Sequence, residues 1–256
     1  ICTNEGNGRY ATNMPDLHVA VMGMERIVRD LNSAAVILKL LGRFATGQRI
    51  TQYVGFTHGP AACDGPKEVH LVIVDNGRTP ILGSRYQEML RCIRCGACLN
   101  VCPVFRLIGG QAFPGCYSGP MGSVLLPLQK GLKEAGEPAR ACTLCRMCME
   151  VCPVRIPLTD LLLDLRNDLV AAGRTPVIER VGMYAASWIV QHPVLYRLTQ
   201  KTIRFGFGPR SFEGWVRQLP SMAGKWTGVK DFPLPAEESF LEQRAREARR
   251  KGRGDG

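Results

Sequence analysis

Two short cysteine runs constrain the fold of this chain more than any other feature. The first run comprises Cys92, Cys95, Cys98 and Cys102. The second run repeats the same spacing with Cys142, Cys145, Cys148 and Cys152. In each run three cysteines fall within seven residues, and a fourth follows after a longer step, directly before a proline. Two full copies of one pattern rarely arise by chance, so the eight thiols are expected to act together.

The spacing C-x-x-C-x-x-C-x-x-x-C-P is typical of polypeptides that hold two four-iron clusters. Three close thiolates bind three corners of one iron–sulfur cube, and the fourth cysteine points away to serve the other cube. The sequence therefore predicts two [4Fe–4S] clusters with crossed ligands. The predicted ligands of cluster 1 are Cys92, Cys95, Cys98 and Cys152. The predicted ligands of cluster 2 are Cys102, Cys142, Cys145 and Cys148.

Other uses of these cysteines fit the spacing less well. A structural zinc site usually shows two separated C-x-x-C pairs, and disulfide frameworks are typical of small secreted chains. Thiolates that serve clusters indicate a reducing compartment, so we predict a cytoplasmic protein. Cys2, Cys63 and Cys116 lie outside both runs. They are interpreted as spare thiols, with Cys116 as an extra or alternative ligand left open.

The chain is long enough for a sizeable core. It has 256 residues, of which 45% are hydrophobic, enough for one large domain or two small ones. No apolar run reaches the roughly 18 residues of a membrane-spanning helix. The sequence begins with Ile1 rather than Met and shows no signal peptide, so we expect the true N-terminus to lie upstream.

Positive charge is concentrated towards the C-terminus. The formal net charge is +11, and residues 174–256 contribute +7 of it. Nucleic acid, an anionic membrane surface or an acidic partner subunit would each suit such a charge, as would a simple solvated end from Arg244 to Arg253. An iron–sulfur regulator that binds nucleic acid is the alternative from another functional class. No recognition helix or basic–aromatic pattern is evident, so we predict no nucleic-acid partner and leave peripheral membrane contact open.

Residues 1–86 show the pattern of part of a parallel α/β domain. Apolar runs predict strands over 17–22, 51–56 and 69–74. A helix over 34–41 is expected, capped by Ser33 and stopped by Gly42. Strand, helix and strand in this order are typical of a parallel sheet.

The opening segment and the histidines carry weaker signals. The Gly-Asn-Gly core of residues 3–9 is interpreted as a turn, although a backbone cradle for an anion is also possible. His18, His58 and His70 have no metal-like spacing to one another and are interpreted as structural.

Residues 87–173 are predicted to form an α-helical ferredoxin. The 39 residues between the runs are rich in Gly and Pro and end in a helix near 121–132. A second helix begins after Pro157 and stops at Gly173. Its apolar face is formed at helical spacing by Leu158, Leu161, Leu162, Leu165 and Leu169.

Residues around the cysteines are expected to tune or shield the clusters. Four arginines flank the runs, and potential tuning, docking of an acidic partner and plain solvation all remain open for them. These are Arg91, Arg94, Arg140 and Arg146. Gly96 is expected to let the backbone pass close to sulfur. The expected apolar shields are Ile93, Leu99, Val101, Leu144, Met147 and Val151.

Residues 174–256 are predicted to form a mostly helical extension. Two helices are expected over 177–190 and 194–205, interrupted by His192-Pro193. Residues 206–235 are rich in Gly and Pro and are expected to be extended. Tyr184, Trp188 and Tyr196 are predicted to pack on the ferredoxin helices. Trp215 and Trp226 are interpreted as core residues, or alternatively as anchors of an interface. No catalytic constellation appears.

Several segments together resemble the lactate utilisation protein B family. They include VIVDNGR at 72–78, the first cysteine run at 90–103, YSGPMG at 117–122 and PLPAEESF at 233–240. Residues 3–9 and 45–48 agree as well, so the resemblance covers essentially the whole chain. The family's second run usually reads Cys-Gly-Ala-Cys, where this chain has Cys145-Arg146-Met147-Cys148, so the ligands are kept.

The resemblance implies an α+β multidomain protein that begins midway through its first domain. The implied domains are the C-terminal part of an α/β lactate-utilisation (LUD) domain at 1–86, the two-cluster α-helical ferredoxin at 87–173 and a helical and extended C-terminal domain at 174–256. The implied role is the iron–sulfur electron carrier of a three-protein system that oxidises L-lactate to pyruvate.

The implied partners are the other lactate-utilisation subunits and a flavin- or quinone-linked electron acceptor. The sequence itself carries no flavin or nicotinamide fingerprint, so the chain is interpreted as an electron-transfer subunit without catalytic residues of its own. The alternative within the same redox class is an iron–sulfur subunit of a glycolate-oxidase or heterodisulfide-reductase-like complex.

Overall fold

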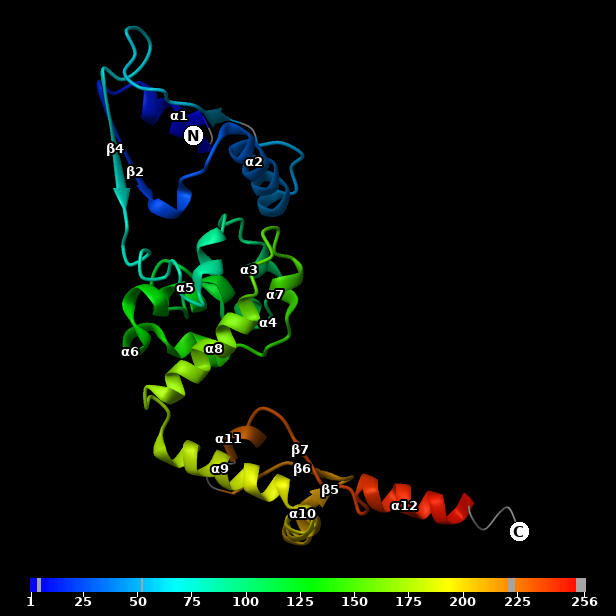
Figure 1. Ribbon diagram of the computed structural model, residues 1–256. Helices are drawn as coiled ribbons and strands as arrows, with labels where there is room; N and C mark the ends of the chain where they lie inside the picture. Colours follow the sequence, from blue (N-terminus) through cyan, green and yellow to red (C-terminus); the bar gives the residue numbers. More distant parts are fainter. Residues whose placement is uncertain (4–5, 52, 221–223, 252–256) are drawn as a thin grey trace. The chain divides into compact units, whose positions relative to one another are not determined.

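The computed structural model describes residues 1–3, 6–51, 53–220 and 224–251. The chain forms two compact units, Ile1–Arg174 and Thr175–Gly256. Helices dominate both units, and the sheets contain only two or three strands (Figure 1). The predicted α+β multidomain fold is therefore confirmed.

The first unit opens with a parallel strand pair and a helix. Strands β2 (Leu17–Gly23) and β4 (Glu68–Val74) run parallel and in register, with Leu17 opposite Glu68. Helix α2 (Leu31–Thr46) lies between them in the sequence. Two apolar runs joined through a helix favour this parallel pairing, as the sequence predicts. The apolar side chains of Val21 and Leu71 are nevertheless exposed.

The predicted strand over 51–56 is wrong in extent and in partner. Only β3 (Val54–Gly55) forms, and it pairs antiparallel with β1 (Cys2–Thr3) in a separate sheet. Residues 6–13 form helix α1 (Gly6–Asn13) and not the expected turn, while positions 4 and 5 lie outside the described residues.

The predicted ends of α2 are also wrong. Asp30 is the N-cap, and its carboxylate accepts a 2.7 Å hydrogen bond from the backbone N–H of Ser33. The helix continues through Gly42, which is buried against Thr51, and ends at Gly47, where φ is +76°. An Asp three residues before a free N–H is as good a cap as Ser, so local pattern alone does not choose between them.

The ferredoxin part of the first unit is entirely helical among its described elements. Its longer helices are α5 (Gly119–Lys130) and α8 (Leu158–Ala171). Its shorter elements are η2 (Gln87–Arg91), α3 (Ala97–Val101), α4 (Pro103–Ile108), α6 (Leu132–Ala135), η3 (Glu137–Ala141) and α7 (Met147–Glu150). The helical link between the cysteine runs is as predicted.

The core of the first unit lies between α5 and α8 (Figure 1). All five leucines predicted for the apolar face of α8 are buried, and Val124 of α5 is fully buried with them. Pro157 caps the start of α8, and Gly173 follows its end with φ of +67°. The helical spacing of apolar residues and the two punctuating residues thus determine this helix.

The second unit contains two long helices and a small antiparallel sheet. Its elements are α9 (Val177–Gln191), α10 (Pro193–Phe207), η4 (Gly208–Arg210), β5 (Ser211–Phe212), β6 (Trp215–Val216), α11 (Gly224–Thr227), β7 (Phe232–Pro233) and α12 (Phe240–Lys251). The two predicted helices are confirmed to within two residues at each end. Within the described ranges, no helix is both long enough and apolar enough to cross a bilayer.

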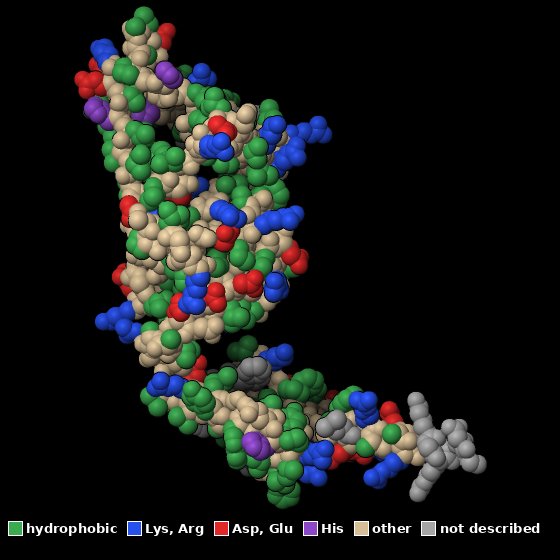
Figure 2. Space-filling view, in the orientation of Figure 1, with side chains coloured by type: hydrophobic (Ala, Val, Ile, Leu, Met, Phe, Trp, Pro, Cys, Tyr) green, Lys and Arg blue, Asp and Glu red, His purple; other side chains and the backbone are tan. Residues whose placement is uncertain are grey.

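Several aromatic side chains of the second unit are exposed, and the core position expected for Trp215 is wrong. The expected packing of Tyr184, Trp188 and Tyr196 on the ferredoxin helices stays a prediction. Tyr184 is 73% exposed and Trp188 is 57% exposed, while Tyr196 and Trp215 are also exposed. The side chain of Trp226 lies outside the described residues. Lys and Arg side chains lie along α12 (Figure 2), and Arg244, Arg246 and Arg249 are exposed there. Arg246 pairs with Glu238 at 2.8 Å.

Burial along α8 gives a direct test of the core. Leu162 is fully buried whereas its neighbour Leu163 is 46% exposed. Leu162→Ala should lower the free energy of unfolding by about 2–5 kcal/mol, because it removes buried surface and leaves a cavity. Leu163→Ala is the matched control and should cost less than about 1 kcal/mol. Anaerobic chemical denaturation measures both, and equal losses would contradict this assignment of the core.

Candidate iron–sulfur site

The two cysteine runs fold into matching loops. In the first run Arg94 and Gly96 have positive φ of 59° and 80°. In the second run the equivalent residues, Leu144 and Arg146, have φ of 56° and 66°. Each loop leads into a short helix, and these two helices, α3 and α7, pack against each other. Left-handed residues turn successive backbone N–H groups towards one side of a loop, where they favour anionic groups.

Backbone N–H groups are directed at the cysteine sulfurs. Sγ of Cys142 accepts a hydrogen bond from the N–H of Leu144, two residues on, at 3.4 Å. Sγ of Cys102 and of Cys152 each accept one at 3.4 Å, from the first turns that follow the Cys-Pro pairs. Such donors stabilise a thiolate over a thiol and tune a bound cluster.

Thiols of the two cysteine runs lie close to one another. The pKa of the Cys148 thiol is raised by burial and by the neighbouring thiols of Cys142, Cys145 and Cys102, against a hydrogen bond from Thr159. Cys102 thus lies within electrostatic reach of the second run, although it belongs to the first. The two runs therefore lie close together, while the crossed ligand set stays a prediction.

The first-run thiols show the same environment. Burial, followed by the charge of Cys92, raises the pKa of Cys98 to about 12, against a hydrogen bond from the Met121 backbone. Burial also raises the pKa of Cys92. Buried thiols of this kind become thiolates only when nearby positive charge, such as bound iron, offsets the cost.

The donor set fits a pair of four-iron clusters. Among the described side chains, no three of His, Cys, Asp or Glu converge on a point where a single metal ion would bind. In a four-iron cube each thiolate binds a different iron, so the sulfurs are spread more widely than around one ion. Eight cysteines in two matched loops, three of whose sulfurs accept backbone N–H groups, suit that arrangement.

Most of the predicted shielding residues are partly buried beside the cysteines, but Met147 is 43% exposed and that prediction is wrong. Leu99 packs so closely on Gly119 that a Cβ there would lie 2.1 Å from Leu99 Cδ2. Gly119 also has φ of +65°, so both space and backbone conformation require glycine at the start of α5.

The four flanking arginines divide into two groups. Arg91 and Arg146 are exposed and form surface ion pairs. Arg94 is partly buried, lies 3.9 Å from the ring centroid of Tyr117 and pairs with Glu25 at 3.1 Å. Arg140 is partly buried and donates to the carbonyl of Arg174. Plain solvation therefore describes only the first two.

Three residues that local patterns do not reveal also contact the cysteine loops. Arg26 donates to the carbonyl of Cys92 at 3.0 Å, Arg166 donates to the carbonyl of Cys142, and Thr159 Oγ1 lies 3.7 Å from Cys148 Sγ. Arg26 is 66 residues from its partner, so no sequence spacing identifies it.

The three cysteines interpreted as spare thiols, Cys2, Cys63 and Cys116, are exposed. Two of the histidines interpreted as structural have partners in the α/β part. His18 Nδ1 lies 3.0 Å from the carbonyl oxygen of Thr12, and His70 pairs with Glu68 at 3.6 Å.

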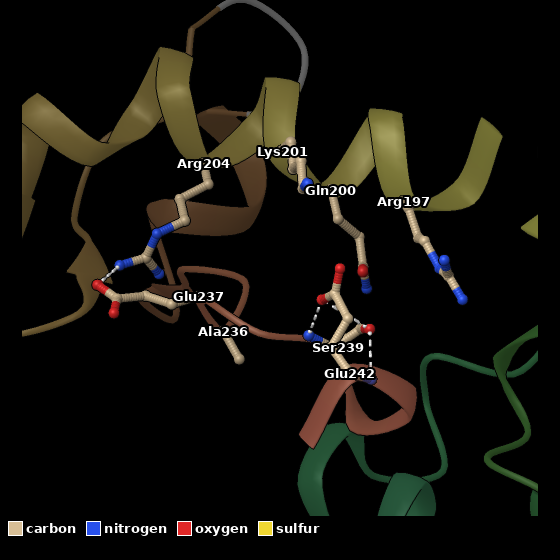
Figure 3. Close-up of a pocket in the computed structure, with 8 residues that line it drawn as sticks. All are labelled: Arg197, Gln200, Lys201, Arg204, Ala236, Glu237, Ser239 and Glu242. Carbon is tan, nitrogen blue, oxygen red and sulfur yellow. Dashed lines mark hydrogen bonds and ion pairs between the residues drawn. The ribbon is translucent and has the colours of Figure 1, made fainter. Parts of the chain in front are cut away.

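A small polar pocket in the second unit is held together by its own residues. Arg204 of α10 pairs with Glu237, and Ser239 and Glu242 bond each other at the start of α12 (Figure 3). The latter pair forms a capping box, which satisfies backbone donors at a helix N-terminus. These contacts fasten residues 235–242 to α10.

Three protein families match successive parts of the sequence. The LUD domain matches residues 1–74, the 4Fe-4S dicluster domain matches 88–156, and "Lactate utilisation protein B, C-terminal" matches 169–249. The second match includes both cysteine runs. No solved structure gives a significant match to the chain.

Curated relatives match along the whole length. Lactate utilization protein B of Bacillus licheniformis is 43% identical over 259 residues, which cover 100% of this chain and 54% of the relative. The protein of the same name from Bacillus subtilis strain 168 is 43% identical and covers 94% of this chain and 51% of the relative. That from Geobacillus kaustophilus is also 43% identical, with 94% and 52% covered. The chain thus spans about half the length of the curated relatives it matches.

Equivalent positions of the two loops hold different residues, Gly96 and Arg146, and this difference gives a test of the loop geometry. Both are left-handed, a conformation that costs an L-residue about 1–2 kcal/mol, whereas glycine tolerates it. Arg146→Gly should stabilise the protein by up to about 1 kcal/mol, and Gly96→Ala should destabilise it by about 1–2 kcal/mol. Anaerobic thermal unfolding measures both, and destabilisation by Arg146→Gly would contradict the assigned conformation.

Proposed function

The chain belongs to the lactate utilization protein B family, and we propose that it is the iron–sulfur electron-transfer subunit of a multi-protein system that oxidises L-lactate to pyruvate. The observation that carries this proposal is the meeting of the two cysteine loops: their short helices α3 and α7 pack together, and Cys102 of the first run lies near Cys148 of the second. Two clusters held by loops in such contact would be suited to passing single electrons between them.

Two [4Fe–4S] clusters are proposed, each with three ligands from one run and one from the other. Cluster 1 is assigned to Cys92, Cys95, Cys98 and Cys152. Cluster 2 is assigned to Cys102, Cys142, Cys145 and Cys148. When bound, such clusters exchange single electrons at potentials set by hydrogen bonds to sulfur, charge and exposure.

The protein's own residues would hold, orient and shield these clusters. The loop N–H groups stabilise the thiolates, and α5 and α8 limit water access on the core side. Oxidation of a hydroxy acid also needs a cofactor that accepts two electrons, and the sequence carries no flavin or nicotinamide fingerprint. The proposal therefore assigns that step to other lactate-utilisation subunits, with a flavin- or quinone-linked acceptor, in the cytoplasm. The division into domains at 1–86, 87–173 and 174–256 is part of the same proposal.

Metal analysis tests the cofactor content. Protein purified without oxygen should contain about eight irons and about eight acid-labile sulfides per chain, from two four-iron clusters. Inductively coupled plasma spectrometry and a sulfide assay measure these values. Zinc without sulfide would refute the proposed role.

The crossed ligand set has a matched pair of variants. Cys152→Ser should disturb the cluster of the first run, and Cys102→Ser should disturb the cluster of the second, because each fourth cysteine serves the other run. Electron paramagnetic resonance of the reduced proteins distinguishes the two signals. Cys116→Ser is the control and should change neither, since Cys116 is exposed and apart from both runs. Loss of the second-run signal in Cys152→Ser would contradict the crossing.

The substrate is tested on the assembled system. A complex recovered by affinity purification from lactate-grown cells should bleach its iron–sulfur absorbance on addition of L-lactate and do so far more slowly with glycolate. The reverse order would favour the glycolate-oxidase-like alternative.

A further inference from the structure

Each of the two cysteine loops is contacted by an arginine, but the two arginines come from different parts of the chain. In each run the backbone carbonyl of the first cysteine accepts a hydrogen bond from an arginine. In the second run this is Arg166 of α8, within the ferredoxin part. In the first run it is Arg26, at the end of η1 (Met24–Arg26), which directly follows strand β2 of the α/β part.

The two arginines differ in how their donors are used. Arg166 donates to the carbonyls of Ala139, Arg140 and Cys142. Arg26 donates through Nη1 to the carbonyl of Cys92 at 3.0 Å, but its Nη2 is buried without an acceptor among the described residues. A buried cationic N–H group is strongly destabilising unless it finds an acceptor. The unused donor therefore points to an acceptor that belongs to the site itself.

The position of Arg26 identifies what that acceptor would be. Its Nη1 donates to the carbonyl of Cys92 at 3.0 Å, so the guanidinium lies directly beside the first cysteine of the loop. The cysteine loop on this side would hold cluster 1, whose thiolate and sulfide sulfurs accept hydrogen bonds.

The guanidinium is held in place by a buried network. Glu25, whose side chain is 7% exposed, pairs with Arg78 and with Arg94, and its Oε1 lies 3.9 Å from Nε of Arg26. Three arginines around one glutamate leave a net positive charge beside the first run. Electrostatic interactions in such a partly buried position are screened less than at the surface.

We propose that Arg26 donates a hydrogen bond from Nη2 to a sulfur of cluster 1 and thereby raises the reduction potential of that cluster. This inference rests on the proposed function, since it requires the cluster to be present. Reduction adds negative charge that spreads over the sulfurs, so a cationic donor stabilises the reduced state more than the oxidised state. No bond is made or broken, and Arg26 acts as a tuning residue and not as a cluster ligand.

The test is a redox titration of the full chain, followed by electron paramagnetic resonance. Arg26→Gln should lower the equilibrium constant for reduction of cluster 1 by about tenfold, which is about 59 mV for a one-electron couple, and leave cluster 2 unchanged. Arg29→Gln is the control, because it removes the same charge three residues away from an exposed side chain. The signal of cluster 1 is identified by its loss in Cys95→Ser.

Each outcome bears on one claim. Arg26→Gln with about eight irons and both midpoint potentials unchanged, or with the same shift as Arg29→Gln, would overturn the inference while leaving the proposed function intact. Wild-type protein without clusters would overturn the proposed function instead. If Arg26→Gln does not assemble, Arg26→Lys keeps the charge and removes the second donor nitrogen. A lower potential of cluster 1 in that variant supports the hydrogen bond, and an unchanged potential refutes it.

Discussion

The structure of the first unit depends on keeping cysteine sulfur inside an apolar core. Burial alone disfavours the thiolate, as the raised pKa values of Cys98 and Cys148 show. Buried thiols can stay protonated and neutral, but to act as cluster ligands they must become thiolates, and the positive charge of bound iron would then offset the cost of burial. Helices α5 and α8 form one wall of the cysteine site, because the apolar core between them also contacts the cysteines.

The loop geometry follows from the same requirement. To wrap a short segment around a cluster, the backbone takes left-handed conformations at two positions in each run. Glycine meets this need at position 96, whereas Arg146 occupies the equivalent position in the second run at a conformational cost. A strained backbone conformation at a functional site persists when the surrounding structure holds it in place. Here the packing of α3 on α7 and the N–H groups directed at sulfur hold the loops in their left-handed conformation.

The sequence predicts those parts of the site that are encoded by a regular residue spacing or by a repeated motif. Cysteine spacing identifies the two loops, and the leucines of α8 identify its buried face, because both patterns are local. The strand expected over 51–56 fails because its pairing depends on distant β1. The predicted N-cap of α2 is wrong because Asp30 and Ser33 are chemically equivalent candidates for that position. Arg26 and Thr159 escape detection because tertiary structure alone brings them to the cysteine loops.

Strand direction explains how the α/β part reaches the first cysteine loop. Strands β2 and β4 are parallel, so their carboxyl ends lie at one edge of the sheet. Glu25 and Arg26 follow the end of β2, and Arg78 follows the end of β4. Functional groups in parallel α/β sheets characteristically gather at this edge. Here Arg26 donates to the carbonyl of Cys92 and Glu25 pairs with Arg94 of the same loop, while Arg78 pairs with Glu25. The α/β part thereby contributes to the surroundings of the first cysteine loop, and a change at that edge would reach this loop directly.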